Sequence, residues 1–376
     1  MKNKIYIIII FFISSYVGLA LASVYLYFQY EKTYLDAKLK FRGEVLNKVT
    51  EVKKIKNTDK VYNDYHYTYE ISGILPFSNI SNSTIVYGKE ADWSVFQTDK
   101  FGFFHNTDDS YLNPNIILLG DSFGKGGFVT ESYVPKNLLE KNGYKTLNLS
   151  SGGGTLVEVA TYLEYAKDYE DKKVLIFFYE GNDYQDNIEE FKNSILIKYF
   201  NDLNFSQNLI SKQNIIDAKI TKRLNRLVLD VEDYKFDLFG VLSLKYLEII
   251  YIKLKYKFYG KEKNQIEDKK LKKLIVKFNN YLLKKNNELI VVHIPLSTRF
   301  NNKNNFEIDN KKNQLANVMS ENNIKFLDFT KYVYEKRLYE KIYRFKNEKK
   351  IFPIKKRHFN KEGYEELIAF ILKNIN

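Results

Sequence analysis

The most constraining feature of this chain is a short apolar run, Asn115 to Leu119, in which apolar and polar residues do not alternate. A strand with this pattern is buried on both faces, as in a parallel sheet covered by helices. The run ends at Gly120, where the missing Cβ permits a sharp turn, and Ser122 follows directly. A serine at the mouth of a buried strand is well placed to act as a nucleophile. Asp121 and Ser122 are also a common helix-capping pair, and on this motif alone the two interpretations weigh equally.

Three further segments follow in order, each at the end of a predicted strand or the start of a predicted helix. Residues 144–149 are apolar and lead into the glycine-rich loop 150–155, and residues 174–179 lead into Gly-Asn-Asp at 181–183. His358 stands just before the final helix. In an open parallel sheet such positions converge on one crevice at the carboxyl edge of the strands. We therefore expect the four segments to form one site.

Together these segments resemble the SGNH, or GDSL-type, hydrolase family of the membrane-anchored bacterial kind. The sequence blocks of that family are a Gly-Asp-Ser, a glycine loop, a Gly-x-Asn-Asp and a late histidine. The matching residues are Gly120, Asp121, Ser122, Gly153, Gly181, Asn182, Asp183 and His358, within residues 115–376. The resemblance implies a flavodoxin-like order of strands and a serine enzyme that acts on ester bonds.

The chemistry of acyl transfer suggests a role for each matched residue. Ser122 is the expected nucleophile, and His358 is the expected base because a neutral imidazole operates near pH 7. An oxyanion needs donors already aimed at it. The expected donors are the backbone N–H groups of Ser122 and Gly153 and the side-chain amide of Asn182, although Gly153 and Asn182 could also be ordinary loop residues. The residues expected to support the surrounding loops are Asp121, Asp183 and Asn360, the last as a helix cap.

One position departs from the family's pattern. The family places an aspartate two or three residues before the histidine, where it orients the ring and stabilises the imidazolium. Here Lys356 and Lys355 occupy those positions. The sequence therefore predicts a Ser–His dyad, helped by a backbone carbonyl or by a remote carboxylate. Asp328 is the remote candidate, although a turn-forming role is favoured for it. The histidines less convincing as a base are His66, His105 and His293.

Apolar runs and helical patterns alternate along residues 111–376, which we interpret as one SGNH hydrolase-like domain. The expected strands are 115–119, 144–149, 174–179, 288–294 and 324–329. This alternation predicts an α/β fold with three layers, α/β/α, around a parallel sheet. Residues 184–285 interrupt it with amphipathic stretches, such as 242–256 and 271–283, and are interpreted as a helical insertion. Helices packed on the sheet are favoured there over a lid or a partner surface.

The N-terminus is predicted to be a membrane anchor. Residues 5–28 carry no charged side chain and are long enough to span a hydrocarbon core of about 30 Å. A cleaved signal peptide is the rival, because Ala20-Leu21-Ala22 has the form of a cleavage site. The apolar run continues past that point, which favours an uncleaved transmembrane helix over residues 1–28 and the lipid bilayer as a partner. Residues 29–110 are interpreted as a juxtamembrane stalk followed by a β-rich lead-in.

Charge and composition narrow the remaining classes. The formal charge of +13 would suit nucleic acid or anionic lipid, but the lysines are scattered, so we expect a solvated surface and no nucleic-acid partner. The chain has no cysteine, which excludes disulfides and thiolate catalysis. No cofactor and no metal is expected. The basic residues after the apolar segment do not favour export, whereas the resemblance places the catalytic domain outside the cytoplasmic membrane (periplasmic or extracytoplasmic). These basic residues are Lys32, Lys38, Lys40 and Arg42.

These expectations combine into a membrane-anchored serine esterase or O-acyltransferase. It would act on acyl esters, in the first instance acetyl esters, through an acyl-Ser122 intermediate, and the resemblance implies a cell-envelope glycan as the substrate. The alternative is a catalytically inactive SGNH-fold module used for binding or assembly at the membrane. The missing aspartate and the helical insertion motivate that alternative.

Overall fold

The computed structural model describes residues 2–26, 33–64, 70, 73–89, 93–229, 268–301, 306–343 and 358–375. The chain divides into two compact units. The first includes α1 (Lys2–Leu26) and most of α2 (Thr33–Lys56). Among the described residues, no helix has the length and apolarity that a membrane crossing requires, so the structure does not support the span predicted for residues 5–28. The predicted domain boundaries at residues 28 and 110 stay predictions.

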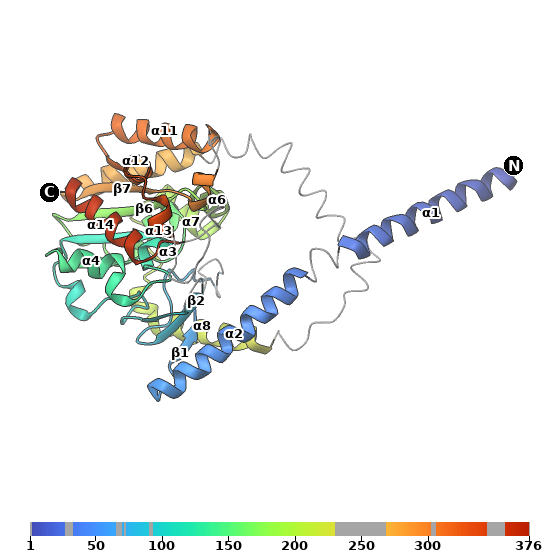
Figure 1. The fold of residues 1–376 in the computed structure, drawn as a ribbon, viewed down its shortest axis with the longest axis horizontal. Helices are drawn as coiled ribbons and strands as arrows, with labels where there is room; N and C mark the ends of the chain where they lie inside the picture. Colours follow the sequence, from blue (N-terminus) through green and yellow to red (C-terminus); the bar gives the residue numbers. More distant parts are fainter. Residues whose placement is uncertain are drawn as a thin grey trace. The chain divides into compact units, whose positions relative to one another are not determined.

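The second unit, Glu51–Leu224 with Glu267–Asn376, is built on a five-stranded parallel sheet (Figure 1). Its strands are β4 (Ile116–Gly120), β5 (Thr146–Asn148), β6 (Lys173–Tyr179), β7 (Glu288–Ile294) and β8 (Lys325–Asp328). Neighbouring strands pair in the order β5-β4-β6-β7-β8, and every pair is parallel. Numbered along the chain, this is the flavodoxin-like order 2-1-3-4-5. The predicted α/β class with a parallel sheet is confirmed.

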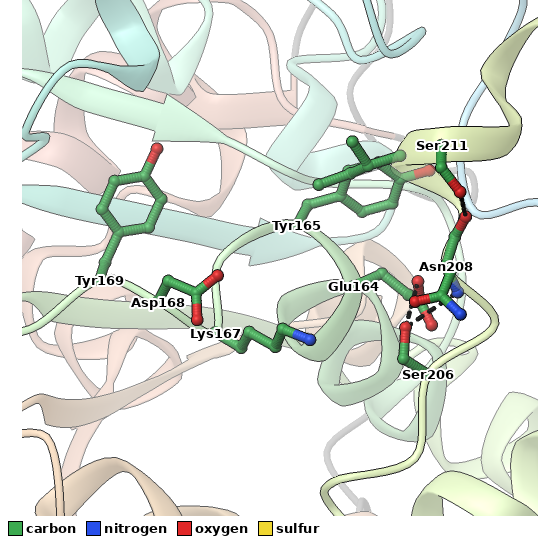
Figure 2. A pocket seen from close by; sticks show the side chains of 9 residues that line it. Glu164, Tyr165, Lys167, Asp168, Tyr169, Ser206, Asn208 and Ser211 are labelled. Atoms are coloured by element: carbon green, nitrogen blue, oxygen red, sulfur yellow. Dashed lines mark hydrogen bonds between the residues drawn. The ribbon is translucent and has the colours of Figure 1, made fainter.

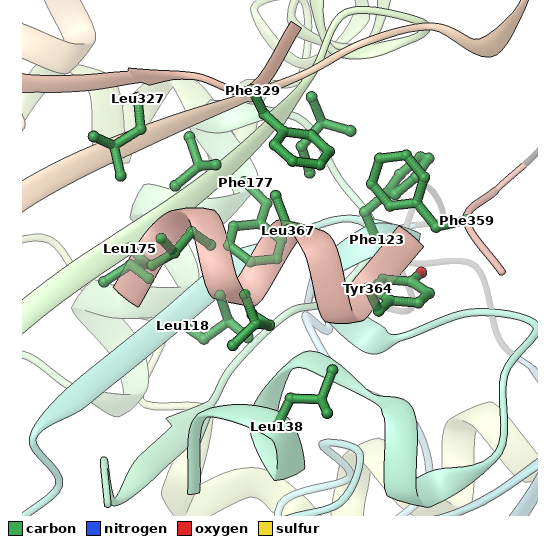
Figure 3. Close-up of a cluster of buried hydrophobic side chains, with 14 of the residues drawn as sticks. Leu118, Phe123, Leu138, Leu175, Phe177, Leu327, Phe329, Phe359, Tyr364 and Leu367 are labelled. Atoms are coloured by element: carbon green, nitrogen blue, oxygen red, sulfur yellow. The ribbon is translucent and has the colours of Figure 1, made fainter. Parts of the chain in front are cut away.

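Helices cover both faces of the sheet, which explains why its strands are apolar without alternation. Alternate side chains of a strand point to opposite faces. Leu118 and Phe177 join α4 (Pro135–Lys141), α12 (Phe329–Lys336) and α14 (Lys361–Ile375) in one buried cluster (Figure 3). The other face is covered by α5 (Thr155–Tyr165), which contacts β4 and β6, and by α11 (Phe306–Glu321), which contacts β8. The result is the predicted three-layer arrangement.

The predicted insertion is helical where the structure describes it. It contains α6 (Asp183–Glu190), α7 (Ser194–Asn201), α8 (Gln213–Leu229) and a helix over residues 268–283. Both α6 and α7 contact α5, and Phe278 packs against Tyr162 of α5 with ring centroids 5.1 Å apart. These helices pack on the domain, which is the interpretation that the sequence favoured. The predicted helix 242–256 lies outside the described residues.

A second, smaller sheet precedes the core and is tied to it. It consists of β1 (Val61–Asn63), β2 (Thr84–Lys89) and β3 (Trp93–Gln97), with β2 in the middle. The turn after β3 is held by Asp99, whose carboxylate accepts hydrogen bonds from two backbone N–H groups of that turn and from the Tyr111 hydroxyl. Gly102 has a φ of +83°, and a Cβ there would lie 1.9 Å from the Asn79 carbonyl oxygen. This turn therefore requires glycine.

Candidate active site

The structure brings together the side chains of Ser122 and His358. Ser122 opens the short helix α3 (Ser122–Lys125) directly after β4, and His358 stands three residues before α14. Ser122 Oγ and His358 Nε2 lie 2.7 Å apart, although 236 positions separate them in the sequence. Both residues are half-buried, so the pair is accessible from solvent. A hydroxyl and an imidazole at this distance have the geometry of a nucleophile and its base.

Asp121 holds Ser122 at the end of β4. Its buried carboxylate accepts a hydrogen bond from the Phe123 N–H at 2.8 Å, which caps α3, and its Oδ2 lies 3.4 Å from Ser122 Oγ. Burial raises the pKa of Asp121, while the Phe123 N–H and the nearby His358 act in the opposite direction. The helix also needs glycine at position 124, because a Cβ there would lie 2.1 Å from Ser150 Oγ.

Two neighbours fix His358 on its C-terminal side. Phe359 is fully buried in the core cluster. Asn360 accepts a hydrogen bond from the Gly363 N–H at 2.8 Å, as a cap of α14, and donates one to the Lys341 carbonyl at 2.7 Å. The positions of Lys355 and Lys356, where the family's aspartate would stand, lie outside the described residues.

Asp328, the remote carboxylate considered for His358, is engaged elsewhere. It caps α12 through the Lys331 N–H and accepts a hydrogen bond from Lys312 Nζ at 2.7 Å. Burial alone would raise the pKa of Asp328, but these two donors lower it below the ordinary value. Its role is the structural one that the sequence favoured for it.

Gly153 lies between β5 and α5, where a side chain has no room. A Cβ at this position would lie 2.5 Å from Val157 Cβ. The turn around it is held by Glu190, whose carboxylate accepts hydrogen bonds from the N–H groups of Gly154 at 2.6 Å, Leu156 at 3.2 Å and Val157 at 3.3 Å. Sequence reasoning missed Glu190, because a single acidic residue at the end of a surface helix carries no signal of such a role.

Asn182 lies at the end of β6, where it is the N-cap residue of α6. Its amide Nδ2 donates to Asp186 Oδ2 at 2.6 Å, and its side chain also acts on Asp121. Asn182 Oδ1 is buried and has no hydrogen-bond partner among the described residues. The neighbouring Asp183 accepts a hydrogen bond from the Tyr179 N–H at 2.7 Å and thereby closes the loop.

The carboxyl groups around these loops are buried and perturb one another. Burial raises the pKa of Asp121, Glu158 and Asp183, and their mutual repulsion raises those of Glu158 and Asp183 further. Burial also raises the pKa of Glu190, to about 8. Neither carboxyl oxygen of Glu158 has a hydrogen-bond partner among the described residues. Burial and the neighbouring carboxylates therefore both favour the neutral form of Glu158 over its charged form.

The two other histidines that the structure describes, His105 and His293, are buried. His293 is fully buried in β7, lies within hydrogen-bond distance of the Thr330 hydroxyl, and has its pKa lowered by burial to about 3. It is therefore neutral and structural, in agreement with the interpretation of the sequence. His105 is buried next to Phe96, at a distance of 4.7 Å between ring centroids. His66 lies outside the described residues.

A separate hollow of about 440 Å³ lies at the far end of α5 (Figure 2). Its wall includes Glu164, Tyr165 and Tyr169, whereas Gly153 precedes the first turn of the same helix. The Glu164 carboxylate is already occupied by Tyr199, Ser206 and two backbone N–H groups. An α-helix of this length is about 16 Å long, so the hollow is distinct from the Ser122–His358 pair.

No model of a protein family matches this chain, and no curated protein matches it. Two solved structures align with it: a member of the lipolytic protein G-D-S-L family from Veillonella parvula DSM 2008, and an acetyl xylan esterase, AlAXEase. Each is 12% identical to this chain with a TM-score of 0.37; each alignment covers 69% of this chain, and 97% and 99% of the other chains respectively.

We predict that the folded state loses stability as the pH rises from about 5 to about 8. In the folded chain the Glu190 carboxyl keeps its proton up to about pH 8, whereas in the unfolded chain it titrates near its ordinary value of about 4.3. Between these values the folded state binds more protons, so a rise in pH favours unfolding. The melting temperature measured from pH 5 to pH 8 should therefore fall.

The control is Glu190→Gln, in which the side-chain oxygen still accepts hydrogen bonds but does not titrate. The slope of melting temperature against pH should be shallower in this variant. A smaller slope of the same sign should remain, because the pKa values of Glu158 and Asp183 are also raised. An identical slope in both proteins would contradict the assignment.

Proposed function

We propose that this protein is an SGNH-type serine esterase that acts on acyl esters through an acyl-Ser122 intermediate. One observation carries the proposal: Ser122 Oγ lies 2.7 Å from His358 Nε2 beside the carboxyl ends of parallel strands. Ser122, Gly153 and Asn182 follow three neighbouring strands, β4, β5 and β6. Ligands of open α/β sheets bind at this edge.

In the first half of the reaction, Ser122 Oγ attacks the carbonyl carbon of the ester while its proton passes to His358 Nε2. The carbonyl π electrons move to the oxygen, which becomes an oxyanion. When the tetrahedral intermediate collapses, the bond between the acyl carbon and the alcohol oxygen breaks. The leaving oxygen takes the proton from His358 Nε2, and the acyl group remains on Ser122.

The second half releases the acyl group. Water attacks the acyl-serine carbonyl while His358 Nε2 accepts its proton, and the same proton returns to Ser122 Oγ as the carboxylic acid leaves. A sugar hydroxyl in the place of water would make the protein an O-acyltransferase instead. Both activities share the acyl-Ser122 intermediate, so both require the Ser122–His358 pair. The resemblance of the sequence blocks adds acetyl esters of envelope glycans as the substrate class.

The oxyanion is proposed to bind the backbone N–H groups of Ser122 and Gly153. Ser122 opens α3, and N–H groups in the first turn of a helix have no intrahelical partner. Asn182 is the proposed third donor. Its amide donates to Asp186 Oδ2, so the side chain would reorient to donate to the oxyanion. Each such donor contributes roughly 3 to 4 kcal/mol to transition-state stabilisation.

We also propose that the chain is anchored in the lipid bilayer and that its esterase domain lies outside the cytoplasmic membrane. Apolar side chains exposed on α1 support it: Ile10, Phe11 and Phe12 are 62%, 67% and 66% exposed. Contiguous apolar surface of this kind is unfavourable in water and is typical of a surface that contacts lipid or a partner. The proposed anchor comprises residues 5–28, with the esterase domain on the outer side.

A fluorophosphonate probe tests the proposed function directly. The folded protein should be labelled at Ser122, and Ser122→Ala and His358→Ala should both lose labelling and lower kcat/KM on p-nitrophenyl acetate by about 10³-fold or more. Ser211→Ala, a change of an exposed serine remote from the site, serves as the matched control and should keep both. Absence of labelling in well-folded wild-type protein would favour the inactive binding module.

A pair of variants tests Asn182 as an oxyanion donor. Asn182→Ala should lower kcat by about 10²- to 10³-fold with little change in KM, because the interaction exists only in the transition state. Asp186→Ala removes the partner of the amide in the free chain and should cost much less. Equal losses in the two variants would show that Asn182 acts only by holding the first turn of α6.

Fractionation tests the proposed location. The full chain should sediment with membranes and resist extraction by alkaline carbonate, and protease added to intact spheroplasts should cleave it. A variant that begins after residue 28 should leave the membrane fraction. Recovery of the full chain in the soluble fraction, or its protection from external protease, would overturn this part of the proposal.

A further inference from the structure

The imidazole of His358 lies between two phenylalanine rings. Phe123 packs on it with ring centroids 4.9 Å apart and an interplanar angle of 32°, and Phe128 with centroids 4.5 Å apart and an angle of 44°. Phe123 is fully buried and belongs to the core cluster, whereas Phe128 is half-buried. Both rings therefore pack on the imidazole whose Nε2 reaches Ser122 Oγ.

The backbone of Phe128 is strained. Its φ is +66°, in the left-handed region that bulky residues rarely adopt. Such a conformation persists only where the surroundings impose it, and it is concentrated at functional sites. Here the turn is set by Gly126, at φ +75°, and by a hydrogen bond from the Gly127 N–H to the Ser122 carbonyl at 2.9 Å. The backbone is therefore strained at the residue whose ring packs on His358.

The small N-terminal sheet supports this ring from behind. Tyr87 of β2 lies 5.4 Å from Phe128 between ring centroids, and the same tyrosine packs against Phe96 and Phe104. A Cβ at Gly127 would lie 3.3 Å from the Tyr87 ring, which shows how closely this turn approaches β2. The sheet that precedes the core therefore contributes to the position of a side chain in the site.

We propose that Phe128 is a positioning residue, which holds the imidazole of His358 from one side and, with Phe123, stabilises the imidazolium that forms during acyl transfer. The face of an aromatic ring carries partial negative charge and attracts a cation within about 6 Å. The proposal rests on the proposed esterase function. In the SGNH family an aspartate just before the histidine stabilises the imidazolium, and in this sequence Lys355 and Lys356 occupy its place. Under the proposal the two rings take over part of that stabilisation.

The helix α3 and its cap carry ionisable side chains close to the Ser122–His358 pair. Asp121 interacts electrostatically with His358, and the buried Lys125 interacts with Asp121. Neither residue is itself replaced in the Phe128 variants. A difference in pH dependence between Phe128 variants therefore reports the loss of the ring.

Three substitutions separate positioning from simple packing. Phe128→Leu removes the ring and keeps most of the bulk, Phe128→Gly removes the side chain and relieves the left-handed strain, and Phe128→Tyr keeps a ring. The Leu and Gly variants should lower kcat about 3- to 30-fold with KM little changed, and Phe128→Tyr should retain near wild-type kcat. In the Leu and Gly variants, the acidic limb of the plot of kcat/KM against pH should move to lower pH. The reason is that the protonated imidazole of His358 loses its contact with the face of the ring.

Stability separates positioning from packing, because relief of the left-handed strain in Phe128→Gly offsets part of the lost packing, so this variant should melt no lower than Phe128→Leu while its kcat falls. The control is Phe205→Leu, which removes another half-buried ring, packed on Tyr199 at 4.8 Å, and should leave kcat and the pH profile unchanged. A rise in KM with kcat unchanged would make Phe128 a wall of the substrate pocket and overturn the proposal. So would wild-type kinetics in Phe128→Leu.

Failure of the esterase function itself looks different. In that case the wild-type protein would neither react with the fluorophosphonate nor hydrolyse the ester, and all Phe128 variants would share that inactivity. An active wild type with an unaffected Phe128→Leu variant would leave the esterase standing and remove only the role of the ring.

Discussion

The two-sided burial of the parallel strands β4, β5, β6 and β7 is the constraint on which the candidate site depends. Because helices cover both faces, the polar groups of the inner strands can meet solvent at the strand ends. The parallel pairing of β4 with β5 and β6 brings the ends of these three strands to the same edge. The serine, the glycine loop and the asparagine thus become neighbours although the chain between them is long. His358 reaches them from the segment just before α14, and α14 packs across the same sheet (Figure 3).

Buried carboxylates hold the loops at this edge. Asp121, Asp183 and Glu190 each accept hydrogen bonds from backbone N–H groups in turns that follow β4, β6 and β5. A buried charge is costly unless it is paired or hydrogen-bonded, and several carboxyls close together cannot all ionise. The same groups that shape the loops therefore make the stability of the domain depend on pH. These buried carboxyl groups therefore determine both the loop geometry and the raised pKa values at this edge of the sheet.

Two kinds of contact hold His358: contacts that fix its backbone and rings that pack on its imidazole. Asn360 and Phe359 fix the backbone that follows it, and the rings of Phe123 and Phe128 fix the plane of the imidazole. Phe123 belongs to the core, whereas Phe128 is supported by the small sheet that precedes it. A part of the chain that looks like a lead-in therefore contacts Phe128, which packs on the imidazole of His358. The backbone of Phe128 adopts a strained left-handed conformation where its ring packs between Tyr87 and His358.

The sequence by itself determined the elements of the core. The run Glu288–Ile294 matches β7 at both ends, and the other strands differ by one or two residues, because two-sided burial leaves a local pattern in the chain. It also indicated Ser122 and His358 through residue types at strand ends. Only the tertiary structure decided their 2.7 Å contact, the binding of the Gly153 turn by Glu190, and the position of Phe128 on the imidazole. Such contacts join residues that are remote or irregular in sequence, so no local periodicity encodes them.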